Sequence, residues 1–259
     1  MKFRWFFFII VSFFFSHGCS TKKAIEPASE INASYDEEST FENEFANEAI
    51  NTIDPLSGYN RAMTSFNDIF FIYALNPVAK TYGYVVPQPV RIGLSNFVEN
   101  ITFPIRFANN LLQGKFFYAG EELERFVINS TIGIGGVMDP ATQIAHIASH
   151  DEDFGQTLGY YGAGSGFPIV IPFLGQSNLR DTAGLVADWQ LSPIVYTHAF
   201  TSYKIPNNNL ETFGIASLYI LNRTSLNLGK YEDLKKDALD LYPFLRDTYE
   251  QKRDAQIDE

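Results

Sequence analysis

The sequence predicts a mainly α-helical protein built from many short helices. Apolar residues recur at spacings of three and four in several stretches, and glycine and proline interrupt these stretches at short intervals. Apart from Ile169-Val170-Ile171, no run of period-two alternation is convincing. After Cys19, no stretch reaches 18 uninterrupted apolar residues. A conventional membrane-spanning helix is therefore not expected there.

The N-terminus resembles a bacterial lipoprotein signal peptide. Two basic residues precede an apolar run, Trp5–Phe15, which is too short to span a bilayer. Cys19 follows this run and is the only cysteine, so it can form no internal disulfide. We therefore expect residues 1–18 to be a signal peptide and Cys19 to be lipidated. The two residues Ser16 and His17 depart from the usual lipobox, and an N-terminal anchor helix with a free cysteine is the alternative.

Charge and composition divide the rest of the chain. Residues 21–52 carry eight acidic and two basic side chains and few aliphatic ones, so residues 19–52 are predicted to be a flexible acidic tether. Residues 53–259 are predicted to form a single helical domain. The formal net charge of −11 argues against nucleic acid as a partner, because phosphate neutralisation needs clustered lysine and arginine.

The first helix is expected to start at Asp54-Pro55, an N-cap followed by proline. Asn76-Pro77 should end or kink this helix. Its apolar stripe widens toward the C-terminal half, which indicates either deep burial or contact with lipid. The stripe consists of Leu56, Tyr59, Met63, Phe66, Phe70 and Tyr73.

The later helices follow from the same periodicity. Pro87-Gln88-Pro89 is expected to be an extended hinge, and glycines after residue 132 should break the helix before them. A charged helix pair near the C-terminus should divide at Pro243. The expected helical ranges are 90–97, 101–112, 121–129, 140–149, 179–189, 210–221 and 230–257.

A glycine-rich stretch, Phe154–Asp181, lies in the middle of the chain. Six glycines and an apolar run, Phe167–Leu174, predict a curved, partly extended segment that leads into a helix capped at Ser177. A plain linker would not carry so many aromatic residues.

Candidate catalytic residues are few. Ser165 is not in a nucleophile elbow, because Ala163 stands where that motif needs glycine. His146 and His150 are four residues apart on a predicted helix, but Ile147 stands where a zinc protease has its glutamate. We expect no metal and no cofactor.

Arginines spread among the apolar helices could bind a lipid phosphate through bidentate hydrogen bonds, or could pair with neighbouring carboxylates. These arginines are Arg61, Arg91, Arg106, Arg125 and Arg180.

Several motifs occur in the order found in one family. They are Asp54–Arg61, Val86–Phe97, Leu111–Gly114, Arg125–Asp139, Phe154–Gly159 and Leu174–Asp181. On these motifs, the chain resembles the MlaA (VacJ) family of outer-membrane lipoproteins, collinearly over about residues 53–255. Gln176, where proline is common, and the long acidic tether depart from the family pattern.

The resemblance implies a ring-like array of amphipathic helices in the inner leaflet of the outer membrane, around a central amphipathic channel. It implies a non-enzymatic protein that removes mislocalised phospholipids from the outer leaflet, with a trimeric porin and a soluble periplasmic lipid carrier as partners. A membrane-associated phospholipase and a structural envelope lipoprotein are the alternatives. Candidate hinge or gate glycines are Gly162, Gly164 and Gly166. Candidate channel or lipid-contacting residues are Arg61, Arg91, Asn96, Tyr160, Tyr161, Phe167 and Phe173.

Overall fold

The structure is a computed structural model that describes residues 53–198, 201–236 and 238–259, all within one compact unit, Thr52–Glu259. The predicted signal peptide, the tether and Cys19 lie outside the described residues. The elements are α3 (Ser57–Phe70), η1 (Phe71–Leu75), α4 (Asn76–Val85), α5 (Gln88–Ile101), α6 (Phe103–Leu112), α7 (Phe116–Thr131), α8 (Pro140–Gln143), α9 (Phe154–Tyr160), β1 (Pro168–Ile171), β2 (Gly175–Asn178), α10 (Leu179–Leu191), η2 (Thr201–Tyr203), α11 (Asn209–Leu226), α12 (Lys230–Lys236) and α13 (Leu241–Asp258).

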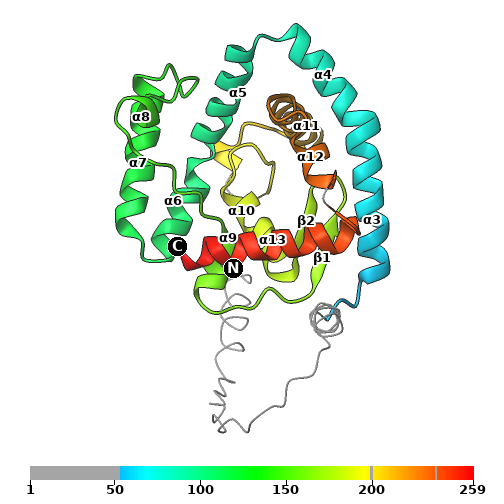
Figure 1. Ribbon diagram of the computed structural model, residues 1–259. Coiled ribbons are helices and arrows are strands. Elements are labelled where there is room, and N and C mark those ends of the chain that lie inside the picture. The colour runs from blue at the N-terminus through cyan, green and yellow to red at the C-terminus, as the bar shows by residue number, and fades with distance from the viewer. Residues whose placement is uncertain (1–52, 199–200, 237) are drawn as a thin grey trace, which may run out of the picture. The chain divides into compact units, whose positions relative to one another are not determined.

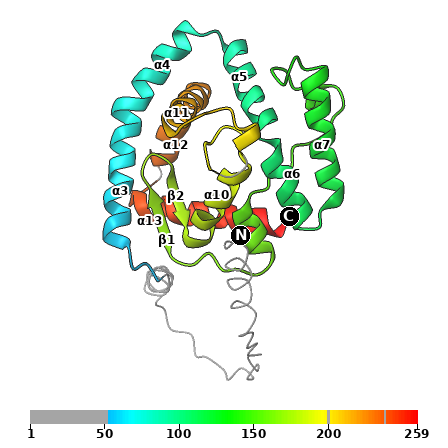
Figure 2. The same ribbon diagram turned by 180° about the vertical axis from the view of Figure 1, so that it is seen from behind.

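Within this unit, α3, α4 and α5 form an arch, and α13 crosses between its two sides (Figure 1). Helix α11 lies inside the arch and packs against α4 and α5. Helix α7 packs against α6 on the outer side of the arch, as the reverse view also shows (Figure 2). The predicted mainly helical, ring-like array is confirmed, with one small antiparallel hairpin, β1–β2, added to it.

Polar side chains fill much of the interior, and apolar side chains cover much of the surface. The fully buried side chains include Asn60, Asn109, Asn178 and Asn222, whereas Tyr73 is 77% exposed. This reverses the usual partition of a water-soluble domain. In the described part of the chain, no helix combines the length and apolar character needed to cross a membrane. The apolar stripe of the first helix was predicted to be either deeply buried or in contact with lipid. Deep burial is therefore wrong for its most exposed side chains.

The first helix begins slightly later than predicted and continues past its proline. Asp54 does not cap it; its carboxylate accepts hydrogen bonds from the Leu56 N–H at 3.2 Å and the Asn60 amide at 3.0 Å. At Pro77, which cannot donate a backbone hydrogen bond, the chain remains helical because a π-helical turn, η1, precedes it. Asn76-Pro77 therefore does not end the helix, and α3 and α4 follow one another with a change of direction (Figure 1).

The predicted helix over residues 140–149 is wrong beyond its first turn. Helix α8 ends at Gln143, and His146 has a left-handed backbone with φ of 55°. Helix α7 holds the following segment through side chains: the Arg125 guanidinium donates to the Ile147 carbonyl, and Glu122 accepts from the His150 N–H at 2.7 Å. His146 and His150 therefore do not share a helical face.

The glycine-rich stretch contains a helix that periodicity did not reveal. Helix α9 starts with a capping box formed by Asp153 and Gln156. A Cβ on Gly155 would lie 2.4 Å from a carboxylate oxygen of Asp181, and a Cβ on Gly184 of α10 would lie 2.4 Å from the Gly155 backbone nitrogen, so glycine at these positions allows the close approach of α9 to α10. The predicted extended segment is present as β1 and β2, but the cap of the next helix is Asn178, not Ser177.

Two asparagines on one face of α3 fix the hairpin. The Asn60 amide donates to the Pro168 carbonyl at 2.9 Å and accepts from the Val170 N–H at 2.9 Å. Two turns later, Asn67 donates to the Ile171 carbonyl at 3.1 Å and accepts from the Phe173 N–H at 2.7 Å. These contacts give hydrogen-bond partners to backbone N–H and carbonyl groups on the hairpin edge that faces α3, and they place the hairpin turn beside η1.

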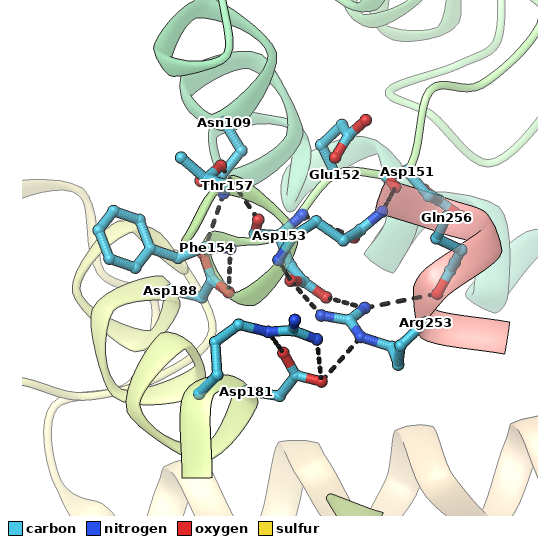
Figure 3. Close-up of polar contacts among 12 residues, drawn as sticks. Asn109, Asp151, Glu152, Asp153, Phe154, Thr157, Asp181, Asp188, Arg253 and Gln256 are labelled. Carbon is cyan, nitrogen blue, oxygen red and sulfur yellow. Dashed lines mark hydrogen bonds and ion pairs between the residues drawn. The ribbon is translucent and has the colours of Figure 1, made fainter. Parts of the chain in front are cut away.

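A buried ionic network joins α9, α10 and α13 (Figure 3). The Arg253 guanidinium contacts Asp153 and Asp181 at 2.8 Å each. Burial alone would raise the pKa of Asp181, but hydrogen bonds from Arg180 and Arg253 hold it below its usual value. Asp188 accepts from the Phe154 N–H and from Asn109 at 3.0 Å, yet burial dominates and raises its pKa to about 6.

Candidate functional site

In the described part of the chain, four adjoining cavities form a row, which we number from its polar end. The first cavity, about 120 Å³, lies between α5, α7 and the segment that follows α7. The second, about 300 Å³, lies between α5, α6, α11 and α13. The two share Glu99, Arg106 and Asp151 in their walls. Charged and amide side chains therefore line this half of the row.

The other half is mostly apolar. The third cavity, about 560 Å³, contains Ile194, Ala216 and Ile220 in its wall. The fourth, about 180 Å³, lies beneath the hairpin turn and contains Phe70 and Phe173. A pocket of several hundred cubic ångströms with apolar walls and a few polar groups is the usual size and composition of a small-molecule site.

Shared residues connect the two halves. Tyr219 and Arg223, one turn apart on α11, line both the second and the third cavity. The third and fourth cavities share Phe71 of η1, Leu174 of the hairpin turn and Tyr231 of α12. The row thus changes from polar to apolar at α11.

The position of α11 depends on a buried asparagine. Asn222 donates to the Arg91 carbonyl at 2.9 Å and to the Ser95 hydroxyl at 3.0 Å, and it accepts from the Tyr82 hydroxyl at 3.0 Å. These contacts tie α11 to both α4 and α5. Arg223, the next residue, is thereby presented to the cavities.

Most arginines of the described residues have carboxylate partners. Arg106 contacts Glu122 at 2.7 Å, Arg125 contacts Asp139 at 3.2 Å, and Arg180 contacts Asp181 at 2.9 Å. For these three, the alternative of carboxylate pairing is therefore the one observed. Arg246 and Arg253 are also paired.

Arg223 differs from these arginines, and the sequence analysis did not select it. In the described part of the chain, no carboxylate oxygen lies within 4.0 Å of its guanidinium nitrogens. Its charge still reaches Glu99, whose pKa is raised first by burial and then by Asp151, with Arg106 and Arg223 opposing this. Only the three-dimensional position of Arg223 between two cavities distinguishes it from the other arginines.

The other predicted polar contact residues each bind a different partner. Arg61 forms an exposed ion pair with Asp240 at 2.6 Å. Arg91 donates to the Ser225 carbonyl at 2.8 Å, so its guanidinium links α5 to α11. Asn96 borders the first cavity and donates to the Val137 carbonyl at 3.1 Å.

The predicted aromatic contact residues also divide into groups. Phe173 reaches the fourth cavity and contacts the rings of Phe66 and Phe70 edge-on. Tyr160 and Tyr161 are exposed at the end of α9, and the Tyr161 hydroxyl donates to the carbonyl of the last residue of α6. Phe167 is half-buried just before β1, and its carbonyl accepts from the first N–H of α10 at 3.1 Å. The structure thus brings only Phe173 and Asn96 of this set to the row of cavities described above.

The three candidate glycines occupy the turn between α9 and β1. Gly162 and Gly166 have φ of +85° and +75°, in the region that favours glycine. Gly164 does not, and a Cβ there would meet nothing within 4 Å. A backbone requirement therefore exists at Gly162 and Gly166 but not at Gly164.

The candidate catalytic residues do not form a dyad. His150 contacts Glu121 at 2.7 Å and stacks on Tyr118, both of α7. Among the described residues, no hydrogen bond joins the Ser165 hydroxyl to a histidine. The described residues also contain no group of three or more histidine, cysteine, aspartate or glutamate side chains that could hold a metal ion.

The chain matches the family model of the MlaA lipoprotein over residues 52–256. It is 34% identical over 204 residues to the intermembrane phospholipid transport system lipoprotein MlaA of Shigella flexneri, and the match covers 78% of this chain and 77% of that protein. The protein of the same name from Escherichia coli K12 is 33% identical, with the same coverage.

A solved structure is similar too. It is described as the structural basis for maintenance of bacterial outer membrane lipid asymmetry, and it aligns with a TM-score of 0.66 at 31% identity over 79% of this chain and 98% of the other. Together with the motifs, the family match over nearly all of the described residues shows that the chain belongs to the MlaA lipoprotein family.

Proposed function

We propose that this protein moves phospholipid between the outer membrane and the periplasm, and that the row of cavities is the path. The observation that carries this proposal is the change from charged walls at Glu99 and Arg106 to apolar walls at Phe71 and Leu174. A phospholipid has one charged end and two apolar chains, so a path with both kinds of wall suits it. The names of the relatives, which are phospholipid transport lipoproteins, agree with this proposal.

The exposed apolar side chains support a location within one leaflet of a membrane. Helix α3 exposes Ile69, η1 exposes Tyr73, the first turn of α7 exposes Phe116 and Phe117, and α4 exposes Tyr84. In water this much apolar surface would be unfavourable, whereas in the headgroup and acyl-chain region its burial is favourable. We propose the inner leaflet of the outer membrane, with Cys19 as the lipid anchor.

In this proposal, mislocalised phospholipid leaves the outer leaflet and passes to a soluble periplasmic carrier. A trimeric porin is proposed as the membrane partner, on the family resemblance. The predicted contact residues keep supporting roles: Asn96 and Phe173 border the path, whereas Arg61, Arg91, Tyr160, Tyr161 and Phe167 are proposed to hold or orient its walls.

The test compares a strain that lacks the gene with the same strain carrying the gene back. We expect more phospholipid in the outer leaflet without the gene and a normal amount after complementation, measured by the accessibility of phospholipid to an outer-leaflet acyltransferase. An unchanged outer leaflet would refute the transport proposal. The phospholipase alternative predicts release of fatty acid by the purified protein and its loss in Ser165→Ala; we expect no release from either.

A further inference from the structure

The boundary between the second and third cavities is the place where the row changes polarity. Arg223 and Tyr219 form this boundary from one face of α11. On one side lie Glu99 and Gln256, and on the other side lies Ile220. A molecule with a charged head and an apolar tail would place the junction of the two at this point.

We propose that Arg223 is the binding position for the phosphodiester of a lipid headgroup, with the acyl chains in the third cavity. The proposal rests on the proposed function and deepens it, because it names the group recognised and the residue that recognises it. A guanidinium presents several N–H donors in a planar fork that matches phosphate oxygens.

The comparison with Arg106, the other arginine in the wall of the second cavity, makes Arg223 the candidate for phosphate binding. Arg106 also borders the second cavity, but its charge is balanced by Glu122 at 2.7 Å, and it donates to the Glu99 carbonyl at 3.0 Å. Arg223 has no ion pair in the described part of the chain; it interacts with Tyr219, one turn earlier on α11, and Glu99 lies beyond 4.0 Å. A phosphate can therefore bind its guanidinium without first breaking a salt bridge.

The walls on the apolar side fit the same ligand. The third cavity, about 560 Å³, adjoins the fourth, with which it shares the wall residues Phe71 and Leu174. Tyr219 borders the headgroup position, and burial raises the pKa of its phenol, so it stays neutral and does not repel a phosphate. A headgroup at Arg223 thus has mostly apolar space on one side for its chains.

A second explanation for Arg223 is local. It lies in the last turn of α11, where a positive charge stabilises the helix C-terminus. Lysine would serve the helix equally well but lacks the planar fork. Comparing Arg223→Lys with Arg223→Gln therefore separates helix stabilisation from bidentate phosphate binding.

The test uses the full-length protein in detergent and two fluorescent probes with identical short chains, a phosphatidylglycerol and a diacylglycerol. We expect the wild type to prefer the phospholipid. Arg223→Gln should weaken phosphatidylglycerol binding by about tenfold or more and leave diacylglycerol binding unchanged, with Arg223→Lys between them. The charge control is Lys252→Gln, an exposed residue of α13, which should bind as the wild type does. Far-UV circular dichroism checks that each variant is folded.

Four results would overturn the inference. If the wild type binds both probes equally, or if Arg223→Gln binds phosphatidylglycerol normally, Arg223 is not a headgroup site and the transport proposal still stands. If inorganic phosphate at low concentration displaces the phospholipid fully, the site recognises free phosphate and not a lipid. If the wild type binds neither probe, the proposed lipid path fails as well.

Discussion

Replacing Asn60 by alanine should destabilise the protein more than the removal of so few atoms suggests. Asn60 is fully buried, and its side-chain amide donates to the Pro168 carbonyl and accepts from the Val170 N–H of the hairpin edge, both at 2.9 Å. The same amide lies 3.0 Å from Asp54 and 3.2 Å from the Tyr242 hydroxyl. Alanine would therefore leave at least two backbone groups without a partner in a site that excludes water.

The magnitude follows from those two groups. A buried polar group without a partner costs about 1–3 kcal/mol, so with two such groups Asn60→Ala should lower the free energy of unfolding by about 2–6 kcal/mol. Asn60→Asp keeps the acceptor for Val170 but loses the donor and places a second carboxylate beside Asp54, so it should rescue little. Asn67→Ala is the matched control. Asn67 makes the same kind of contacts in a part-buried site, where water can replace them, and about 1 kcal/mol is expected.

The assay is urea unfolding of the full chain in a mild detergent, followed by far-UV circular dichroism. The m-value should stay constant across the variants, so that a changed midpoint reports stability. An Asn60→Ala variant within about 0.5 kcal/mol of the wild type would refute the view that α3 holds the hairpin through this amide.

Three further predictions concern other parts of the chain. Burial raises the pKa of Asp188 to about 6, above its unfolded value, so the wild type should lose stability as pH rises from about 4 to 7 and the carboxyl ionises. Asp188→Asn cannot ionise and should therefore gain stability relative to the wild type over this range, as measured by urea titrations. A stability difference that stays constant with pH would contradict this prediction. Gly155→Ala should lower the free energy of unfolding by about 2 kcal/mol or more in the same titrations, because its Cβ would overlap Asp181. Gly164→Ala is the control: a Cβ there has open space, and the change should be nearly neutral. Equal effects of the two changes would argue against close helix packing as the reason for glycine at residue 155. Cys19→Ala should leave the protein unlipidated and absent from the outer-membrane fraction, and unchanged fractionation would count against the predicted lipid anchor.

The sequence was sufficient for most helices because their apolar spacing is regular. It failed where side chains from a distant element hold the backbone. Residues 144–150 have helical composition, but Arg125 and Glu122 of α7 bind their backbone, and no local pattern indicates this. Helix α9 was missed for a related reason. Its glycines suggest a loop, and only the packing of Gly155 against α10 and of Gly159 against α13 explains them in a helix.

The predicted site was harder to obtain from sequence than the fold. Any arginine among apolar helices could meet a phosphate, and the sequence does not show which of them already has a carboxylate partner. Arg106, Arg125 and Arg180 do, through residues that are not all near them in sequence. Arg223 has no distinguishing motif, and its place between two cavities depends on how Asn222 docks α11 onto α4 and α5.

The polar interior explains how a row of cavities, the proposed lipid path, can exist in such a small protein. An interior of close-packed apolar side chains would leave few voids, whereas directional bonds from Asn60, Asn109 and Asn222 hold helices at fixed positions with space between them. The apolar side chains are then available for the outer surface and for the walls of the third and fourth cavities. The exposed apolar surface and the internal row of cavities therefore have the same physical basis, which is the placement of hydrogen-bonding side chains inside and apolar ones outside.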